Sequence, residues 1–269
     1  MTHILMHNSA NDQRRIWLFA GTGDGPHLTR ALLQRGWQVR VSVASQAAAA
    51  AYSELAVDSI TVGTLSRAAK MTKGLKHRSK FRWVVDATHP FATRISSDLA
   101  EVCLSAKQPF LRFERPQEQG SASICLLPNS GALSTAPLKG QRLLLAVGGR
   151  HLAAIATAAR SAGANLFARS MPTKLGLRSA LAAGLLPDHL AVVRPLQGQT
   201  PGSIERALCR RWGITAVVCR QSGGVTERLW RRISEEQVLQ LILLRRPASL
   251  QGVETVVGEA AFFNRIDHG

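Results

Sequence analysis

Short apolar segments that end in glycine or polar residues recur along most of this chain, and each is followed by a segment with helical spacing. The first apolar segment, residues 16–20, ends at Gly21, and apolar residues such as Leu28 and Leu32 then recur at helical spacing over residues 26–35. Buried parallel strands are nearly continuous apolar runs, whereas a helix carries an apolar stripe. The alternation therefore predicts an α/β protein with parallel sheets.

The same pattern predicts two halves of similar organisation. In the first half we expect strands at residues 38–44, 59–62, 82–85 and 109–113, with helices at 47–55 and 91–106. In the second half we expect strands at residues 142–147, 166–169, 189–194 and 214–219, with helices at 151–162, 202–212 and 226–233. Residues 237–244 fit either a last strand or a buried helix.

A segment rich in serine, proline and glycine separates the two halves. This segment, residues 116–140, is interpreted as an interdomain connection with one short strand at residues 124–127. We expect a flexible leader at residues 1–14 and two doubly wound α/β domains, at residues 15–128 and 140–265, with a cleft between them.

The charge balance restricts the partners of the chain. The 269 residues carry a net charge of +17 at pH 7, and such a field attracts nucleic acid, an anionic membrane or a small polyanion. A single tyrosine and little interleaving of aromatic and basic residues argue against nucleic acid. No apolar run reaches about 18 residues, so we expect no membrane span. The densest basic cluster, residues 70–80, is interpreted as a solvated helix and loop.

The cysteines indicate neither a metal site nor a disulfide framework. Cys103, Cys125, Cys209 and Cys219 are scattered without paired spacing, so we expect reduced, buried thiols and no bound metal. The N-terminal residues lack the pattern of a secretory signal. Together these features predict a cytoplasmic protein.

The turn after the first predicted strand is a candidate phosphate site. It reads Gly21, Thr22, Gly23, Asp24, Gly25, where glycine lets the backbone approach a phosphate and the following helix offers free N–H groups. Its spacing departs from G-x-G-x-x-G, and a tight turn without a ligand is the alternative interpretation.

The end of the second predicted strand bears on which dinucleotide would bind. It carries no acid for a ribose 2′-hydroxyl, and Arg40, Ser42 and Ser45 lie there instead. Their chemistry favours NADPH over NADH, although NADH stays open.

An acid, a hydroxyl and an imidazole lie together after the strand at residues 82–85. They are Asp86, Thr88 and His89, followed by Pro90 where a first helical turn would start. Either His89 acts in catalysis, with Asp86 orienting it, or Thr88 caps the helix and His89 bonds to the backbone.

Arginines follow many of the predicted strands. They are Arg112, Arg115, Arg150, Arg169, Arg194 and Arg220. Guanidinium groups bind carboxylates bidentately, so arginines gathered around one cleft would hold a polyanion. Each of them taken alone is equally compatible with a solvated surface charge.

Several of these stretches together resemble the precorrin-6A reductase family. The stretches are VVDATHPFA (residues 84–92), PFLRFERP (109–116), LAVGGR (145–150) and RQSGG (220–224), in the family's order within residues 15–247. The resemblance implies two Rossmann-like domains without the usual fingerprint. The first would hold NADPH, the second would contact the substrate, and the tetrapyrrole would lie between them. It further implies reduction of a ring double bond of precorrin-6A in cobalamin biosynthesis, with hydride from the nicotinamide and a proton added at the neighbouring carbon.

The resemblance also assigns residues to the two ligands. The cofactor would be bound by Gly21, Thr22, Gly23, Asp24, Ser45, Asp86, Thr88, His89 and Pro90. The substrate's carboxylates would be bound by Arg112, Arg115, Arg150, Arg169, Arg194, Arg220, Ser222, Gly223, Gly224 and Arg228. The family's Lys-Asn-Ser-Gly-Gly turn begins here with Arg220 and Gln221, and residues 195–201 differ from its Arg-Gly-Pro-like turn.

Several alternatives stay open at this point. The proton donor is His89, Ser222 or a bound water, and the substrate does or does not already contain cobalt. The rival functions are another dinucleotide-dependent enzyme acting on a polyanion, because fold does not fix function, and a basic nucleic-acid-binding protein. For the reductase we expect the tetrapyrrole as ligand, with no nucleic acid and no membrane, and transient contacts with neighbouring enzymes of the pathway.

Overall fold

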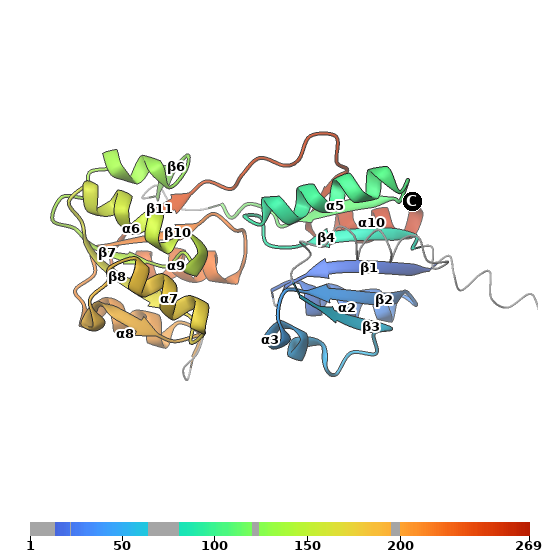
Figure 1. The fold of residues 1–269 in the computed structure, drawn as a ribbon, viewed down its shortest axis with the longest axis horizontal. Helices are drawn as coiled ribbons and strands as arrows, with labels where there is room; N and C mark the ends of the chain where they lie inside the picture. The colour runs from blue at the N-terminus through green and yellow to red at the C-terminus, as the bar shows by residue number, and fades with distance from the viewer. Residues whose placement is uncertain (1–13, 22, 64–80, 120–123, 195–199) are drawn as a thin grey trace, which may run out of the picture. The chain divides into compact units, whose positions relative to one another are not determined.

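The computed structural model describes residues 14–21, 23–63, 81–119, 124–194 and 200–269 (Figure 1). The expected leader up to residue 13, Thr22, the basic cluster at residues 70–80 and residues 195–199 lie outside the described residues. The chain divides into two compact units, one made of residues 1–116 and 247–269 and the other of residues 117–246.

The first unit contains a parallel sheet of six described strands in the order β12-β5-β4-β1-β2-β3. The strands are β1 (Arg15–Ala20), β2 (Gln38–Val43), β3 (Ser59–Val62), β4 (Trp83–Ala87), β5 (Phe110–Glu114) and β12 (Thr255–Val257). The helices are α2 (Gly25–Gln34), α3 (Gln46–Ala49), η1 (Ala50–Tyr52), α5 (Thr93–Ser105) and α10 (Gly258–His268).

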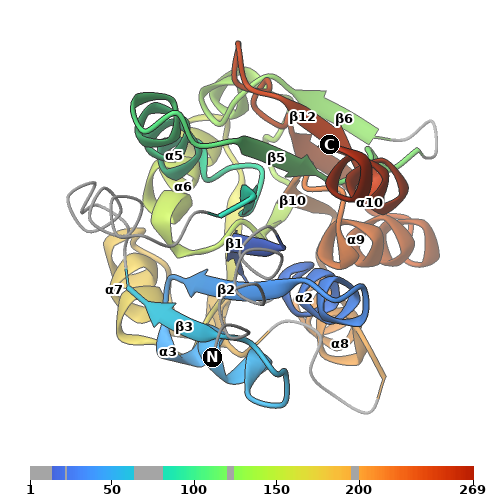
Figure 2. The ribbon, with the colours of Figure 1, turned by 90° about the vertical axis from the view of Figure 1, so that its right-hand side faces the viewer.

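Helices cover both faces of this sheet. Leu28 and Leu32 of α2, Tyr52 of η1 and Phe262 of α10 pack with one side of the strands into a buried core. Leu99 and other residues of α5 pack with the opposite side of β1 and β4. Figure 2 shows α2 and α10 on one side of the sheet and α5 on the other. The strand-and-helix alternation of the sequence therefore produces the expected doubly wound unit.

The second unit repeats this architecture, with six described parallel strands in the order β6-β11-β10-β7-β8-β9. The strands are β6 (Ile124–Leu127), β7 (Arg142–Leu145), β8 (Asn165–Ser170), β9 (Leu190–Val192), β10 (Ala216–Arg220) and β11 (Gln240–Leu244). The helices are η2 (Gly131–Thr135), η3 (Gly149–His151), α6 (Leu152–Ser161), α7 (Lys174–Ala182), η4 (Pro187–His189), α8 (Ser203–Arg211) and α9 (Val225–Glu236). The expected α/β class with two parallel-sheet domains is confirmed, and the cleft between them stays a prediction.

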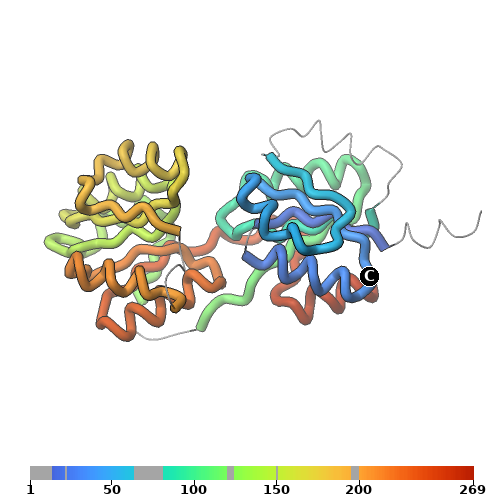
Figure 3. Tube along the Cα trace, turned by 90° about the horizontal axis from the view of Figure 1, so that it is seen from below, coloured from blue at the N-terminus to red at the C-terminus, as the bar shows by residue number. Residues whose placement is uncertain are grey.

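The two units exchange their edge strands. β6 follows β5 in the chain but pairs with β11, and β12 follows β11 but pairs with β5. A parallel neighbour normally needs a crossover of about a dozen residues or more, and the links at residues 115–123 and 245–254 are shorter. The chain therefore passes from one unit to the other twice, and Figure 3 shows the two passages in green and in orange-red.

This exchange corrects the expected domain boundaries. Residues 124–127 were assigned to the N-terminal domain but form β6 in the sheet of the second unit. Residues 247–265 were assigned to the C-terminal domain but contribute β12 and most of α10 to the first unit. Apolar periodicity marks an edge strand without indicating which sheet it joins, and this is why the boundaries were wrong.

The elements themselves follow the expected pattern with a few differences. Residues 237–244, which fitted a strand or a buried helix, provide strand β11. The helix expected at residues 47–55 is shortened to α3 and η1, and α7, β12 and α10 were not expected. None of the helices that the structure describes is long and apolar enough to cross a bilayer.

Candidate active site

The glycine-rich turn of the first unit connects β1 to α2 and is held by a tyrosine. The hydroxyl of Tyr52 donates a hydrogen bond to the carbonyl of Gly21 at 2.7 Å. A Cβ atom at Gly25 would overlap the Tyr52 hydroxyl and lie 2.7 Å from Cβ of Ala20. Glycine at this position is therefore required by a close approach of neighbouring atoms.

An ion pair lies beside the same turn. Arg115, which follows β5, pairs with the carboxylate of Asp24, and both side chains are partly buried. A Cβ atom at Gly23 would lie 2.7 Å from Nη2 of Arg115, so the guanidinium rests against this glycine. Asp24 is the N-cap residue of α2, yet its side chain forms no capping hydrogen bond. Asp24 and Arg115, expected on different ligands, contact each other in this structure.

The end of β2 carries one of the three polar residues expected there. Ser45 follows the strand, and its hydroxyl accepts a hydrogen bond from the N–H of Ala48 at 3.3 Å. Ser42 is buried within β2 and accepts a hydrogen bond from the Trp17 indole at 2.8 Å. Arg40 lies earlier in β2, 4.5 Å from the Trp17 ring, where burial and then the nearby charge of Arg15 lower its pKa. Only Ser45 occupies the strand end at which a ribose phosphate is expected.

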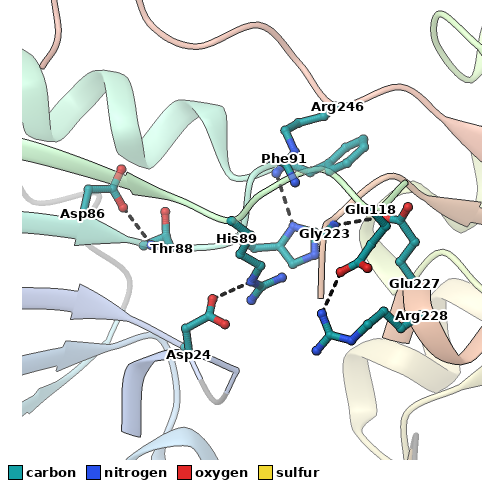
Figure 4. A network of polar contacts seen from close by, with 12 residues as sticks. Asp24, Asp86, Thr88, His89, Phe91, Glu118, Gly223, Glu227, Arg228 and Arg246 are labelled. Atoms are coloured by element: carbon teal, nitrogen blue, oxygen red, sulfur yellow. Dashed lines mark hydrogen bonds and ion pairs between the residues drawn. The ribbon is translucent and has the colours of Figure 1, made fainter. Parts of the chain in front are cut away.

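The turn after β4 is built around a buried ion pair. The side chain of Asp86 is fully buried, and its Oδ2 lies 2.8 Å from Nη1 of Arg112 on β5. Oδ1 of Asp86 accepts a hydrogen bond from the N–H of Thr88 at 2.9 Å, which Figure 4 shows, and Arg112 donates to the Thr88 hydroxyl at 3.2 Å. Arg112, expected to bind substrate, therefore ties this turn to the neighbouring strand.

His89 is exposed and is oriented by the backbone. The N–H of Phe91 donates to Nδ1 of His89 at 3.2 Å (Figure 4). Because Nδ1 accepts this bond, the neutral ring carries its proton on Nε2. The expectation that a helical turn starts at Pro90 with Thr88 as its cap is wrong, since α5 begins at Thr93 and its N-cap is Ala92.

The turn after β10 in the second unit is buried and is fixed by a glutamate. Gln221, Ser222, Gly223 and Gly224 are all buried. The carboxylate of Glu227, in the first turn of α9, accepts a hydrogen bond from the N–H of Gly223 at 2.7 Å (Figure 4). The other oxygen of this carboxylate accepts from Arg231 at 2.7 and 2.9 Å.

A second arginine closes this turn from the end of β11. The backbone N–H of Arg246 donates to the side-chain oxygen of Gln221 at 3.1 Å, and Nε of Arg246 donates to the Gln221 carbonyl at 3.4 Å. The segments that follow β10 and β11 are therefore joined by hydrogen bonds.

The arginines expected in the second unit lie in different surroundings. Arg220 donates to the carbonyl of Val147 and lies against Gly148. Arg169 lies 3.4 Å from the buried carboxylate of Glu205 on α8. Burial lowers the pKa of Arg169, and the charge of Glu205 acts in the opposite direction.

The remaining arginines of this set are exposed or undescribed. Arg228 pairs with Glu118 at 2.6 Å (Figure 4), and about half of the Arg228 side chain stays exposed. Arg194 is exposed. The side chain of Arg150 lies outside the described residues. The expected convergence of arginines from both units stays a prediction.

Sequence reasoning missed three residues that shape these turns. Glu227 stands three positions after Gly224, which is the spacing of a helix-capping acid and was available as a signal. Arg246 follows a strand that had been left ambiguous with a helix. Tyr52 contacts a turn 31 positions away in the chain and gave no local signal. Among the residues that the structure describes, no group of three His, Cys, Asp or Glu side chains could hold a metal ion.

The geometry defines the class of protein, and the comparisons define the family. Two doubly wound parallel sheets, each with glycine-rich or polar turns at the ends of its strands, place the chain among α/β proteins with two Rossmann-like units. The chain belongs to the Precorrin-6x reductase CbiJ/CobK family, whose sequence model matches residues 15–264. The resemblance seen in the sequence is thereby confirmed, and so is the assignment to a reductase family of cobalamin biosynthesis.

Individual relatives agree with this family. The chain is 30% identical over 242 residues to a cobalt-precorrin-6A reductase of Synechocystis sp., covering 88% of this chain and 90% of the relative. It is 25% identical over 237 residues to a precorrin-6A reductase of Rhodobacter capsulatus, covering 87% and 88%. A solved structure, "CobK precorrin-6A reductase", matches the fold with a TM-score of 0.73 at 22% identity, covering 95% of this chain and 97% of that chain.

Proposed function

We propose that this chain reduces a ring double bond of precorrin-6A, or of its cobalt-containing form, with NADPH as the hydride donor. The match of the reductase family over residues 15–264 carries this proposal. The glycine-rich turn at residues 21–25 supports a dinucleotide, and the net charge of +17 supports a substrate with several carboxylates. NADH is the second cofactor to be tested.

The first turn of the first unit fits the pyrophosphate of a dinucleotide. Among the described residues, no atom beyond the two chain neighbours lies within 4 Å of the position that a Cβ at Gly21 would occupy, which leaves room for a ligand there. The guanidinium of Arg115 lies against Gly23, and α2 begins at Gly25 with its free N–H groups. Ser45, at the end of β2 where no acid stands, would contact the ribose and favours the 2′-phosphate of NADPH.

The substrate's carboxylates would bind to the arginines that can reach solvent. Arg194 and Arg228 are exposed, whereas Arg112 and Arg169 are buried against carboxylates of the protein. If either arginine left its carboxylate to bind the substrate, a buried carboxylate of the protein would lose its partner at a high cost in free energy. We therefore assign Arg112 and Arg169 to holding the fold of the site, and Arg194 and Arg228 to the substrate; Arg220, which is partly exposed, is the next candidate for a substrate carboxylate.

His89 would act as a hydrogen-bond donor through its Nε2–H. When bound, the nicotinamide supplies the hydride, and a proton must reach the adjacent ring carbon. The N–H of Phe91 occupies Nδ1 of His89, so a second proton on this ring would cost that hydrogen bond. Ser222 is buried. The geometry therefore favours a bound water as the proton source, with His89 Nε2–H orienting it or the reacting ring.

The direct test follows nicotinamide absorbance with the purified protein. We expect NADPH oxidation only when precorrin-6A or its cobalt form is present, with a smaller kcat/KM for NADH. Arg228→Ala should raise KM for the tetrapyrrole about tenfold, the loss of one exposed charge-assisted contact. Arg265→Ala on α10, which breaks another partly exposed pair, with Glu254, is the matched control. Absence of oxidation with both tetrapyrroles and both cofactors would contradict the proposal.

A further inference from the structure

Tyr52 reaches from the core to the glycine-rich turn of the first unit. It ends η1, which lies between β2 and β3, and its ring is fully buried among residues of α2 and the sheet. Its hydroxyl donates to the carbonyl of Gly21 at 2.7 Å. A side chain fixed by the core therefore holds the residue at which the turn begins.

The same hydroxyl also limits the far end of the turn. A Cβ atom at Gly25, where α2 begins, would overlap the Tyr52 hydroxyl. One atom thus bonds to the first residue of the turn and lies against the last. The turn cannot widen at either end without breaking the Tyr52 hydrogen bond or moving α2.

The Tyr52 hydroxyl keeps the proton that it needs for this hydrogen bond near neutral pH. A buried phenol hydroxyl needs a hydrogen-bond partner, and here the partner is the backbone carbonyl of Gly21. Burial, and then the charge of Asp24, raise the pKa of Tyr52 well above its usual value. The hydroxyl therefore stays protonated near neutral pH and can donate this hydrogen bond.

We propose that Tyr52 is a positioning residue of the cofactor site, whose hydroxyl holds Gly21 and Gly25, the two ends of the turn, in the positions that receive the pyrophosphate. The inference rests on the proposed role of this turn in binding NADPH. Tyr52 itself is buried beneath the turn, so it acts through the backbone of Gly21 and Gly25 and makes no contact with the cofactor.

The isosteric variant Tyr52→Phe tests this proposal, because it keeps the ring in the core and removes only the hydroxyl. We expect the Kd of NADP⁺ and the KM of NADPH to rise by about 3- to 10-fold, the loss of one hydrogen bond. The kcat and the KM of the tetrapyrrole should stay unchanged. Ser53→Ala is the matched control, since it removes a neighbouring hydroxyl that bonds only within η1, to the carbonyl of Ala50 at 3.0 Å.

A second measurement needs no cofactor. Hydrogen exchange of the amides at residues 23–25 should be faster in Tyr52→Phe than in the wild type, and unchanged in Ser53→Ala. Unchanged exchange in Tyr52→Phe would overturn the inference. So would an unchanged Kd of Tyr52→Phe for NADP⁺, provided that the wild type binds NADP⁺. A wild type that binds neither NADP⁺ nor NADPH would instead overturn the proposed cofactor, and the exchange data would still decide whether Tyr52 holds the turn.

Discussion

The two units share one strand order but fix the turns after β4 and β10, each the third strand in the order of its sheet, in different ways. After β4, Asp86 accepts the N–H of Thr88 and pairs with Arg112 from the neighbouring strand. After β10, Glu227 accepts the N–H of Gly223 and pairs with Arg231 of the same helix. A buried acid thus holds each turn, through a contact between strands in the first unit and within one helix in the second.

The two acids differ in how many segments of the chain a substitution would affect. A change at Asp86 alters β4, β5 and the turn that carries His89 together, because the three are joined by one ion pair. The hydrogen bonds of the Glu227 carboxylate lie within α9 and the turn before it. The acid after β4 therefore acts on segments that are more distant in the chain than those held by the acid after β10.

Deleting residues 247–269 is expected to have the largest effect, and to unfold the first unit although the deletion removes the C-terminal end. β12 pairs with β5, and Phe262 and Ile266 of α10 are buried in the core of the first unit. Each such side chain contributes about 1.5–3 kcal/mol on burial. Hydrogen exchange read by mass spectrometry should show lost protection in β1 to β5 and retained protection in β7 to β11.

The opposite pattern of protection would contradict the assignment of β12 and α10 to the first unit. If the second unit lost protection while the first kept it, the exchange of β12 for β6 would not describe the folded protein. Fluorescence provides an independent reading, because Trp17, Trp37 and Trp83 lie in the first unit and Trp212 and Trp230 in the second.

Asp86→Asn is expected to lower the free energy of unfolding by up to about 3–5 kcal/mol, because it leaves the buried guanidinium of Arg112 with only the more distant carboxylate of Glu114, 3.8 Å from its Nε. Urea unfolding measures this value. Asp58→Asn, which breaks a more exposed pair with Arg15 in the same unit, should cost at most about 1 kcal/mol.

A parallel pair of variants sharpens this result. Glu227→Gln should cost less than Asp86→Asn, because Arg231 keeps some access to solvent and the new amide still accepts the N–H of Gly223. Equal costs for the two variants would show that a contact between strands holds its turn no more firmly than a contact within one helix.

The strands and their polar ends could be predicted because both signals are local. An apolar run of strand length placed Gly21 directly after β1, as observed, whereas Asp86, expected after its strand, is the last residue but one of β4. The sheet that an edge strand joins could not be predicted, since the pairing of β6 with β11 links residues more than 100 positions apart. The length of the connecting segments determines which sheet an edge strand can join, and apolar periodicity does not report that length.

The candidate site shows the same limit. Arginines were expected at the ends of the strands at β5 and β8; Arg112 lies within β5, Arg115 follows it and Arg169 lies within β8. All three contact carboxylates of the protein itself. Arg112 pairs with Asp86, Arg115 with Asp24 and Arg169 with Glu205. These partners lie 26 to 91 positions away in the chain, so no motif reports them. The composition predicted a field of positive charge, and only the fold shows which charges are already matched.

The smallest expected effect compares the first turn of each unit. At Gly25 an added Cβ would overlap the Tyr52 hydroxyl and lie 2.7 Å from Ala20, whereas at Gly149 the nearest atom would be Oγ of Ser179 at 3.3 Å. Gly25→Ala should therefore cost about 1–3 kcal/mol of unfolding free energy despite the higher helix propensity of alanine. Gly149→Ala should stay within about 0.5 kcal/mol.

Urea unfolding of these two variants tests whether the turns differ in rigidity as well as in available space. A protein that absorbs a methyl group at Gly25 as easily as at Gly149 must move Tyr52 or α2 to make room. The first turn would then be as adaptable as the second, and the hydroxyl of Tyr52 would lose its role as the fixed point of the first unit. A cost confined to Gly25→Ala means that the core side chain, and not the glycine content, sets the shape of the turn.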